Sequence, residues 1–240
     1  MRRTNLDISI RDSIEDHMYG LKWWLKETND TPLEEMSSFF DTRIDDYIPH
    51  MERWNNAYEI FPQYIPPHVK TILDLGCGSG LELDHIIPLF PDADITGIDL
   101  SIVMLKELSS KYPNVHIIQA DYCEYPFDSN KFDAVISFES LHHLFPEKKL
   151  RLYSTIKSCL NDDGIFINCD YFACCNEEET LLQRTLMEKR EKAPLLYDKH
   201  VHFDIPLTLS HEADLLETAG FSSCEALSSH SGACFLKASP

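Results

Sequence analysis

Residues 71–80, Thr-Ile-Leu-Asp-Leu-Gly-Cys-Gly-Ser-Gly, decide the fold, because a short apolar run there leads directly into a loop with three glycines. The run predicts a buried β-strand from Thr71 to Leu75, and Leu81 to Pro88 has the length and apolar spacing of a helix. Glycines allow a tight turn and a close approach of a ligand to the backbone, and the helix N-terminus offers unpaired N–H groups. The stretch therefore predicts a site for a nucleotide-like ligand.

Downstream of this loop, short β-rich runs alternate with helical stretches, which is typical of a parallel sheet built from βαβ units. The expected strands are Thr71 to Leu75, Asp94 to Ile98, Val115 to Gln119, Phe132 to Phe138 and Ile165 to Cys169. The expected helices are Leu81 to Pro88, Ile102 to Lys111 and Glu147 to Leu160. This alternation predicts a doubly wound sheet.

The alternation stops after Cys169. We expect helices over Glu177 to Lys192 and Ser210 to Ala219, and an antiparallel hairpin formed by Ser222 to Ser228 and Ala233 to Ala238 at one edge of the sheet. The predicted fold is thus α/β, with a Rossmann-like, doubly wound, seven-stranded, mostly parallel sheet and an antiparallel edge hairpin. An insert over 171–208 is expected to lie on the carboxyl edge of the sheet as a lid.

The N-terminal part, residues 1–69, lacks strand signals and carries helix punctuation. Thr31-Pro32-Leu33-Glu34 offers an N-cap threonine, a proline at the first helical position and a capping-box glutamate, and so predicts the start of a helix. We expect a helical N-terminal cap over 1–69 and the main α/β domain over 70–240.

The composition is that of a folded, acidic protein: 43% of the residues are hydrophobic, and 21 Lys and Arg stand against 40 Asp and Glu, for a net charge of −19. This charge disfavours a nucleic-acid partner. No stretch approaches the roughly 20 apolar residues of a membrane helix, and the N-terminus lacks the apolar core of a secretory signal, so we expect a cytoplasmic protein with no membrane association. The eight cysteines form no C-x-x-C pair and are expected to be reduced thiols.

The spacing of the glycines discriminates between nucleotide cofactors. A dinucleotide fingerprint, G-x-G-x-x-G, would need a glycine at the position of Leu81, whereas the loop reads G-x-G-x-G. Asp74 at the mouth of the loop would oppose a pyrophosphate but would suit a ligand that carries an ammonium and a sulfonium. The charge therefore favours S-adenosylmethionine over a dinucleotide.

Two further acids follow the next two expected strands. Asp99 ends one strand, where a carboxylate can accept hydrogen bonds from both hydroxyls of a ribose. Asp121 follows another, where a carboxylate could accept a hydrogen bond from the adenine amino group. Either acid alone is equally well explained as a helix cap. Together with the glycine loop they favour a cofactor site.

These motifs resemble those of the class I S-adenosylmethionine-dependent methyltransferases. The resemblance rests on residues 74–80, on Asp99, on Asp121-Tyr122 and on Phe132-Asp133-Ala134-Val135-Ile136-Ser137, and it covers about residues 70 to 170. It implies S-adenosylmethionine as the cofactor, with the glycine loop at the methionine part, Asp99 at the ribose and Asp121 at the adenine. The cofactor-binding residues expected on this basis are Asp74, Gly76, Cys77, Gly78, Gly80, Asp99, Leu100, Met104, Asp121, Tyr122 and Phe138.

The residues that follow the fourth expected strand indicate the substrate class. Phe138-Glu139-Ser140-Leu141-His142-His143-Leu144 is similar to the small-molecule branch of this family, and the Asn/Asp-Pro-Pro-Tyr motif associated with methylation of exocyclic amines of bases or of glutamine amides is missing. We expect a small-molecule acceptor that presents an O, N or C nucleophile. The sequence leaves open whether the chain forms a homodimer.

Methyl transfer from a sulfonium is an in-line displacement that needs positioning first, and a general base only where the nucleophile must lose a proton. His142 and His143 follow the fourth strand, near the expected position of the methyl group, and are the candidate catalytic residues; the alternative is a helix start with one ring packed and one exposed. In the cap, Arg43 and Tyr47 belong to a segment that resembles the part of the family that closes over the cofactor. For these two the alternative is a surface ion pair and a core aromatic ring.

His200, His202 and Asp204 alternate along an extended segment, so their side chains would lie on one face and resemble a set of metal ligands. Because no further matched ligand is evident, we expect no metal and assign these residues to the lining of the acceptor pocket.

Three other functions remain as alternatives. The first is an enzyme that modifies S-adenosylmethionine itself, similar to carboxy-S-adenosylmethionine synthase. The second is a non-catalytic module that binds the cofactor or a partner. A nicotinamide oxidoreductase is the least favoured, because of Leu81.

Overall fold

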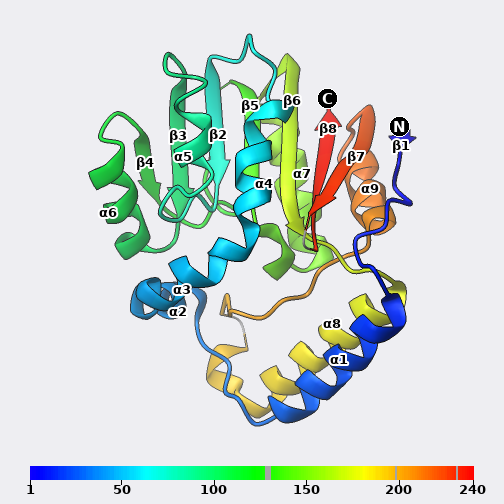
Figure 1. The fold of residues 1–240 in the computed structure, drawn as a ribbon. Coiled ribbons are helices and arrows are strands. Elements are labelled where there is room, and N and C mark those ends of the chain that lie inside the picture. The colour runs from blue at the N-terminus through cyan, green and yellow to red at the C-terminus, as the bar shows by residue number, and fades with distance from the viewer. Residues whose placement is uncertain (128–130, 198, 231) are drawn as a thin grey trace.

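The computed structural model describes residues 1–127, 131–197, 199–230 and 232–240, without the side chains of residues 44, 47, 48, 50, 54 and 55. Its centre is an eight-stranded sheet in the order β1-β7-β8-β6-β5-β2-β3-β4 (Figure 1). The strands are β1 (Arg2–Thr4), β2 (Thr71–Leu75), β3 (Asp94–Asp99), β4 (His116–Gln119), β5 (Phe132–Phe138), β6 (Leu160–Tyr171), β7 (Ser223–His230) and β8 (Ala233–Ser239). Strands β2 to β6 are parallel, and β8 runs antiparallel to both β6 and β7.

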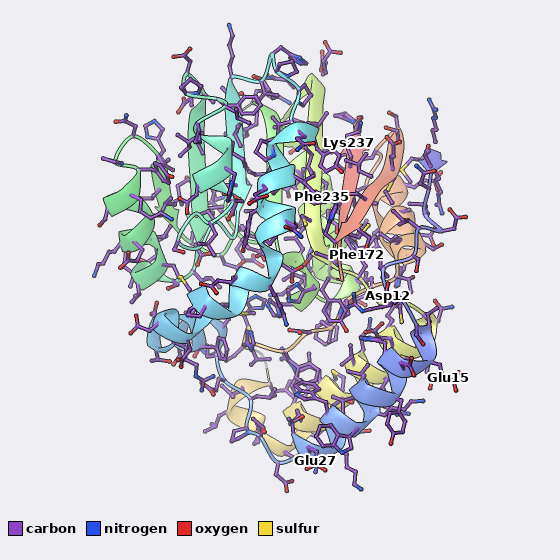
Figure 2. The ribbon with its side chains drawn as sticks, in the orientation of Figure 1. Asp12, Glu15, Glu27, Phe172, Phe235 and Lys237 are labelled. Atoms are coloured by element: carbon purple, nitrogen blue, oxygen red, sulfur yellow. The ribbon has the colours of Figure 1, made fainter. Side chains whose placement is uncertain are left out.

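Helices cover both faces of this sheet, which makes it doubly wound. One apolar cluster joins the sheet to α7 (Pro146–Cys159) and α9 (Leu209–Thr218), and a second joins its other face to α4 (Asn55–Ile60), η2 (Phe61–Tyr64), α5 (Leu83–Ile86) and α6 (Ile102–Lys111). The central strands are buried on both faces because alternate side chains enter one cluster or the other. Phe235 of β8, labelled in Figure 2, is fully buried and meets the ring of Phe61 at 5.3 Å.

The remaining helices gather at the carboxyl edge of the parallel strands (Figure 1). They are α1 (Ile14–Glu27), α2 (Met36–Thr42), α3 (Ile44–Met51), η1 (Glu52–Trp54), η3 (Leu141–His143), α8 (Asn176–Lys192) and η4 (Pro194–Leu196). Helices α1 and α8 lie side by side and share a third apolar cluster, which includes Leu25 and Leu182, whereas Glu15 and Glu27 of α1 are exposed (Figures 1 and 2). The N-terminal segment and the insert thus form one layer over this edge.

The sheet has one strand more than the seven predicted. Arg2–Thr4 adds to the open edge of β7 in parallel, and the Arg2 N–H donates to the Ser222 carbonyl at 2.7 Å. Arg3 also pairs with Asp214 of α9 at 2.7 Å. A run of three polar residues carries no apolar alternation, so its strand depends on the free edge that β7 offers. The first residues of the expected helical cap therefore belong to the sheet.

The helix start predicted at Thr31 is wrong, because α2 begins at Met36. The preceding residues are extended and form hydrogen bonds with the insert instead. The His202 N–H donates to the Glu34 carbonyl at 3.0 Å, and the Lys189 ammonium donates to the Thr31 carbonyl at 2.9 Å. Tertiary hydrogen bonds thus override the local capping signal.

Among the described residues, no helix is long and apolar enough to cross a membrane.

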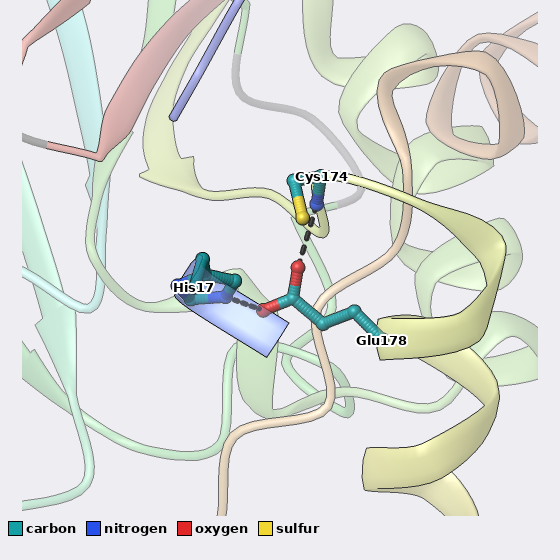
Figure 3. Close-up of side chains that lie close together, drawn as sticks. All are labelled: His17, Cys174 and Glu178. Atoms are coloured by element: carbon teal, nitrogen blue, oxygen red, sulfur yellow. Dashed lines mark hydrogen bonds and ion pairs between the residues drawn. The ribbon is translucent and has the colours of Figure 1, made fainter. Parts of the chain in front are cut away.

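Glu178 ties the N-terminal helix to the insert (Figure 3). Its fully buried carboxylate bonds His17 of α1 at 2.6 Å, accepts the Cys174 N–H at 2.7 Å and accepts the Tyr171 hydroxyl. Burial alone would raise the pKa of Glu178, but these hydrogen bonds outweigh it and lower the pKa. Folding therefore favours the ionised form of this side chain.

We expect Glu178→Gln to lower the free energy of unfolding at pH 7 by about 2 kcal/mol, because an amide cannot accept hydrogen bonds at both of its ends. Since the folded-state pKa lies below the unfolded value, the stabilisation is present above the unfolded pKa and is lost as the pH falls through the folded pKa. The gap between wild type and variant in urea denaturation should therefore narrow in acid. Glu177→Gln, which removes an exposed ion pair with Lys22, is the control and should change little. If both substitutions lower the free energy of unfolding equally, Glu178 does not tie α1 to the insert.

Candidate functional site

The loop after β2 has a left-handed backbone at its three glycines. The φ angles are 74° at Gly76, 49° at Gly78 and 75° at Gly80, in the region where glycine is favoured. At Gly76 an added Cβ would also overlap the hydroxyl of Ser140, which follows β5. The G-x-G-x-G spacing is therefore required by the shape of the loop and by its close approach to the neighbouring strand.

Asp99, the last residue of β3, fixes this loop. One of its carboxylate oxygens accepts the Gly78 N–H at 3.0 Å, and the other accepts the Ser101 N–H at 2.8 Å. Burial raises the pKa of Asp99, and the hydrogen bonds oppose that shift in part. Each carboxylate oxygen has a second lone pair, so the side chain can bind a ligand hydroxyl while it holds the loop.

A pocket opens above the loop at the carboxyl ends of β2, β3 and β5. Of the residues predicted from the sequence, it is lined by Gly76, Gly78, Asp99, Leu100, Met104, Tyr122, Phe138 and His143. Met36 and Phe40 of α2, Glu139 and Ser140 after β5, and His200 of the insert complete the lining. We call this the cofactor pocket.

Four other predicted cofactor residues do not line this pocket and instead support its wall. Asp74 is fully buried, and Cys77 fills the space beside Gly97, where an added Cβ would lie 2.7 Å from its sulfur. Gly80 supplies a left-handed turn, and Asp121 accepts the Cys123 N–H at 2.8 Å in the turn after β4. Direct contact of these residues with the cofactor stays a prediction.

The two predicted cap residues differ in what can be said of them. Arg43 pairs with Glu34, lies 4.5 Å above the ring of Phe39 and lines a second cavity, described below. To bind a carboxylate of the cofactor, Arg43 would have to break its ion pair with Glu34. The side chain of Tyr47 lies outside the described residues.

Asp74 and Glu82 form a buried pair of acids beneath the loop. Both are almost fully inaccessible, and neither carboxylate oxygen of Asp74 has a hydrogen-bond partner in the described structure. Burial, with the nearby Glu82, raises the pKa of Asp74 well above its usual range, and burial raises the pKa of Glu82 to about 7. Ionisation of this pair therefore opposes folding.

We expect Glu82→Gln to stabilise the protein at alkaline pH. The folded-state pKa of about 7 exceeds the ordinary value of 4.5, so the contribution of Glu82 to stability is greatest below 4.5 and declines as the pH rises toward 7. Urea denaturation at pH 8 should show a gain on the order of 2 kcal/mol, with little difference at pH 4.5. Glu107→Gln on the exposed face of α6 is the control. Destabilisation by Glu82→Gln at pH 8 would overturn this explanation.

A second cavity of about 810 Å³ lies between the N-terminal helices and the insert. We call it the acceptor cavity, after the role proposed for it below. Its aromatic wall consists of Trp24, Phe39, Phe40 and Tyr171, and its charged or titratable lining consists of Arg11, Asp16, His17, Arg43, Asp46, Arg53, Glu139, His142, His143, His202 and Asp204. His202 stacks on Phe39 at 3.6 Å. His202 and Asp204 line this cavity, whereas His200 lies in the cofactor pocket, and their contact with an acceptor stays a prediction.

Glu139 is a site residue that sequence reasoning missed. It follows β5 directly, has a φ of 48° and donates its N–H to the Cys169 carbonyl at 2.8 Å. Its Oε1 atom is buried without a hydrogen-bond partner among the described residues, and burial raises its pKa to about 8. Glu139, Phe40 and His143 line both cavities. Its position after the fourth expected strand could have identified it. Ligands bind where the strand order of such a sheet reverses, which here is between β2 and β5.

The two predicted catalytic histidines are buried in η3 and differ in charge. His142 Nδ1 lies 2.6 Å from Asp170, and its Nε2 lies 3.5 Å from Asp204. Burial lowers the pKa of His142, but the two carboxylates outweigh burial and raise it well above the usual range. His143 lies 3.2 Å from the Phe203 carbonyl, and burial together with the charge of His142 lowers its pKa. The pair thus forms part of one network of histidines and acids.

Comparison with known proteins agrees with this geometry. Residues 72–164 match the family model of a methyltransferase domain. The chain is 24% identical over 205 residues to carboxy-S-adenosyl-L-methionine synthase of Nautilia profundicola, covering 80% of this chain and 86% of that protein. It is 32% identical over 118 residues to malonyl-[acyl-carrier protein] O-methyltransferase of Legionella pneumophila, covering 45% of this chain and only 40% of that relative.

Among solved structures, a complex of DhpI with S-adenosylhomocysteine has a TM-score of 0.64 at 18% identity, covering 85% of this chain and 94% of that one. At this identity the likeness shows the fold.

The doubly wound sheet, with a glycine loop beside the point where its strand order reverses, defines a Rossmann-like enzyme for a nucleotide-like cofactor. Residues 72–164 form a methyltransferase domain, so the protein is an enzyme of the class I S-adenosylmethionine-dependent methyltransferase type, and its cofactor is S-adenosylmethionine. The family, the fold class and the cofactor predicted from the sequence are confirmed, apart from the number of strands.

Proposed function

We propose that the protein transfers the methyl group of S-adenosylmethionine to an O, N or C nucleophile of a small molecule bound in the acceptor cavity. The observation that carries this proposal is the lining that the two cavities share, formed by Phe40, Glu139 and His143. An acceptor bound on one side of these residues would meet the cofactor on the other. Such an arrangement supplies the positioning that an in-line displacement requires.

The residues that line the cofactor pocket indicate how the cofactor would be oriented in it. Asp99 would bind the ribose hydroxyls, and Leu100 and Met104 would pack on the adenine, near Tyr122. The methionine part would lie along the glycine loop beside Phe138. This orientation directs the sulfonium toward Glu139 and the acceptor cavity.

The size of the acceptor cavity supports a small molecule as the substrate. Its volume of about 810 Å³ lies within the range of small-molecule sites, which is about 300–1,000 Å³. Its walls come from α1, α2 and the insert, and the hydrogen bonds between residues 34–36 and 200–202 join two of these walls. These hydrogen bonds hold two sides of the cavity in a fixed relation, which would position a bound methyl acceptor.

His142 and His143 are the residues that we propose to orient and activate the nucleophile. Both line the acceptor cavity, and His143 also borders the cofactor pocket. A nucleophile placed beside them would stand close to the sulfonium. Asp170 holds the imidazole of His142 through its contact with Nδ1 at 2.6 Å, and Asp204 lies 3.5 Å from Nε2 on the other side of the ring.

A second candidate function is modification of S-adenosylmethionine itself. It is favoured by the relative from Nautilia profundicola, whose name describes synthesis of carboxy-S-adenosylmethionine and which aligns over 86% of its length. In this case the acceptor cavity would hold a carboxyl donor, and Arg11 or Arg43 would be placed to bind it.

Asp99→Ala should weaken binding of S-adenosylmethionine by about 30-fold or more, because it removes the acceptor of two charge-assisted hydrogen bonds to the ribose. Isothermal titration calorimetry measures the effect, and thermal unfolding checks the fold. Asp94→Ala alters an exposed residue at the opposite end of the same strand and should leave affinity unchanged. If Asp99→Ala binds S-adenosylmethionine as tightly as the wild type does, the proposed binding mode of the cofactor is wrong.

Mass spectrometry of the cofactor released from purified protein separates the two candidate functions. A methyltransferase should release S-adenosylmethionine or S-adenosylhomocysteine. Release of a species heavier by one carboxylate, and its loss in Arg43→Gln but not in Arg2→Gln at the far edge of the sheet, would instead establish the carboxylated cofactor.

A further inference from the structure

Three donor atoms face one another at the wall of the acceptor cavity. His142 Nε2 and His143 Nδ1 each lie 3.5 Å from the same Asp204 oxygen, and the three ligand atoms lie within 4.8 Å of one another. Hydrogen bonds of the N–H···O type are typically about 2.7–3.2 Å long. Both nitrogens are therefore too far from Asp204 for a good hydrogen bond, although His142 and Asp204 carry opposite charge.

The spacing fits a metal ion better than it fits hydrogen bonds. Imidazole nitrogens and carboxylate oxygens bind zinc at about 2.0–2.2 Å, so ligands of a tetrahedral site stand about 3.3–3.6 Å apart. We propose that His142, His143 and Asp204 bind a divalent transition-metal ion. Two imidazoles and one carboxylate are a donor set suited to zinc, cobalt or iron rather than to magnesium or calcium.

Asp170 supplies the support that such a site needs behind its ligands. It bonds His142 Nδ1 at 2.6 Å and is itself held by the Tyr171 N–H at 3.0 Å and by the Asn168 amide at 3.3 Å. In the metal-bound form, His142 Nδ1 carries the proton and donates it to Asp170. The Nε2 lone pair is then free to bind the ion, which lies on the side of Asp204. A carboxylate behind a metal-bound histidine is a recurrent arrangement that fixes the ring and raises its basicity.

His142 must release its Nε2 proton when the ion binds, and His143 must give up a hydrogen bond. Its Nδ1 lies 3.2 Å from the Phe203 carbonyl and 3.5 Å from Asp204. In the metal-bound form the Nδ1 lone pair turns to the ion, and Nε2 carries the proton instead. The carboxylates of Asp170 and Asp204 lie on the two sides of His142 and make this part of the cavity favourable for a cation.

The His17, Cys174 and Glu178 cluster in Figure 3 is the contrasting case. Its donors also lie close together, but they already satisfy one another: Glu178 bonds His17 at 2.6 Å and the Cys174 N–H at 2.7 Å. A metal there would have to displace good hydrogen bonds. We therefore assign the ion to the Asp204 cluster and a tethering role to Glu178.

Three protein ligands leave a coordination position toward the acceptor cavity, as in catalytic rather than structural zinc sites. This inference rests on the proposed function and specifies the substrate class: the acceptor is a molecule whose hydroxyl binds the ion. The ion lowers the pKa of the hydroxyl, the proton leaves to solvent, and the oxygen forms its bond to the methyl carbon as the bond from carbon to sulfur breaks. The products are the methyl ether and S-adenosylhomocysteine, whose sulfur is a neutral thioether.

The test measures metal binding alone and needs neither cofactor nor acceptor. The full chain, stripped with a chelator under reducing conditions, is titrated with Co²⁺ followed by visible absorption, and with Zn²⁺ against a chromophoric chelator. We expect one ion per chain, a cobalt d–d band of reduced symmetry and a zinc Kd below about 1 μM. Asp204→Asn and His142→Gln should weaken binding at least 100-fold, and Asp170→Asn by about 10- to 100-fold.

Two matched controls lie in the same cavity. Asp46→Asn removes another carboxylate of the lining, and His17→Gln removes a histidine bonded to an acid outside the proposed site. Both should retain the metal, and circular dichroism melts confirm that each variant folds. Absence of the cobalt band in the wild type, or equal affinity in Asp204→Asn, overturns the metal site. Binding of S-adenosylmethionine measured on the same samples shows separately whether the cofactor site stands.

Discussion

The parallel pairing of β2 with β5 is the constraint on which the rest of the site depends. Leu75 lies beside Ser137 in this register, and the Ser137 hydroxyl donates to the Leu75 carbonyl at 2.9 Å. After β2 the chain crosses to one side of the sheet, and after β5 it crosses to the other, so the two loops diverge and leave a crevice. The glycine loop and Glu139 face each other across that crevice. Gly76 must lack a side chain because Ser140 already occupies the space.

Buried acids take two opposite roles around this crevice. Asp74 lies beneath the loop with no hydrogen-bond partner among the described residues, and burial raises the pKa values of both Asp74 and Glu82, so their ionisation opposes folding. Glu178 is equally inaccessible, yet its hydrogen bonds lower its pKa and make it a stabilising tether. The difference is the number of donors that each carboxylate meets, because an unpaired buried charge is costly and a well-bonded one is not. Strained or unsatisfied acids thus gather at the site, and satisfied ones hold the surrounding layer in place.

The acceptor side is built by segments that are distant in the sequence. Residues 34–36 and 200–202 exchange backbone hydrogen bonds, and the Ile205 N–H donates to the His142 carbonyl at 2.9 Å. The insert therefore positions Asp204 beside the two histidines of η3. Through these contacts the N-terminal helices, the insert and the residues after β5 line one cavity, and neither the helices nor the insert alone supply its whole lining.

By itself the sequence determined the α/β class, the alternation of the five central parallel strands with helices, the glycine loop and the cofactor, because these depend on local periodicity and on backbone angles that only glycine adopts easily. Helix α6 has the predicted bounds. Only the tertiary structure decided the eighth strand, the extended course of residues 31–35, the role of Glu139 and the meeting of Asp204 with His142 and His143. Each of these depends on partners far away in the chain: a free sheet edge, a neighbouring carbonyl or a cavity wall. Local patterns carry no information about such partners, since packing rather than propensity brings them together.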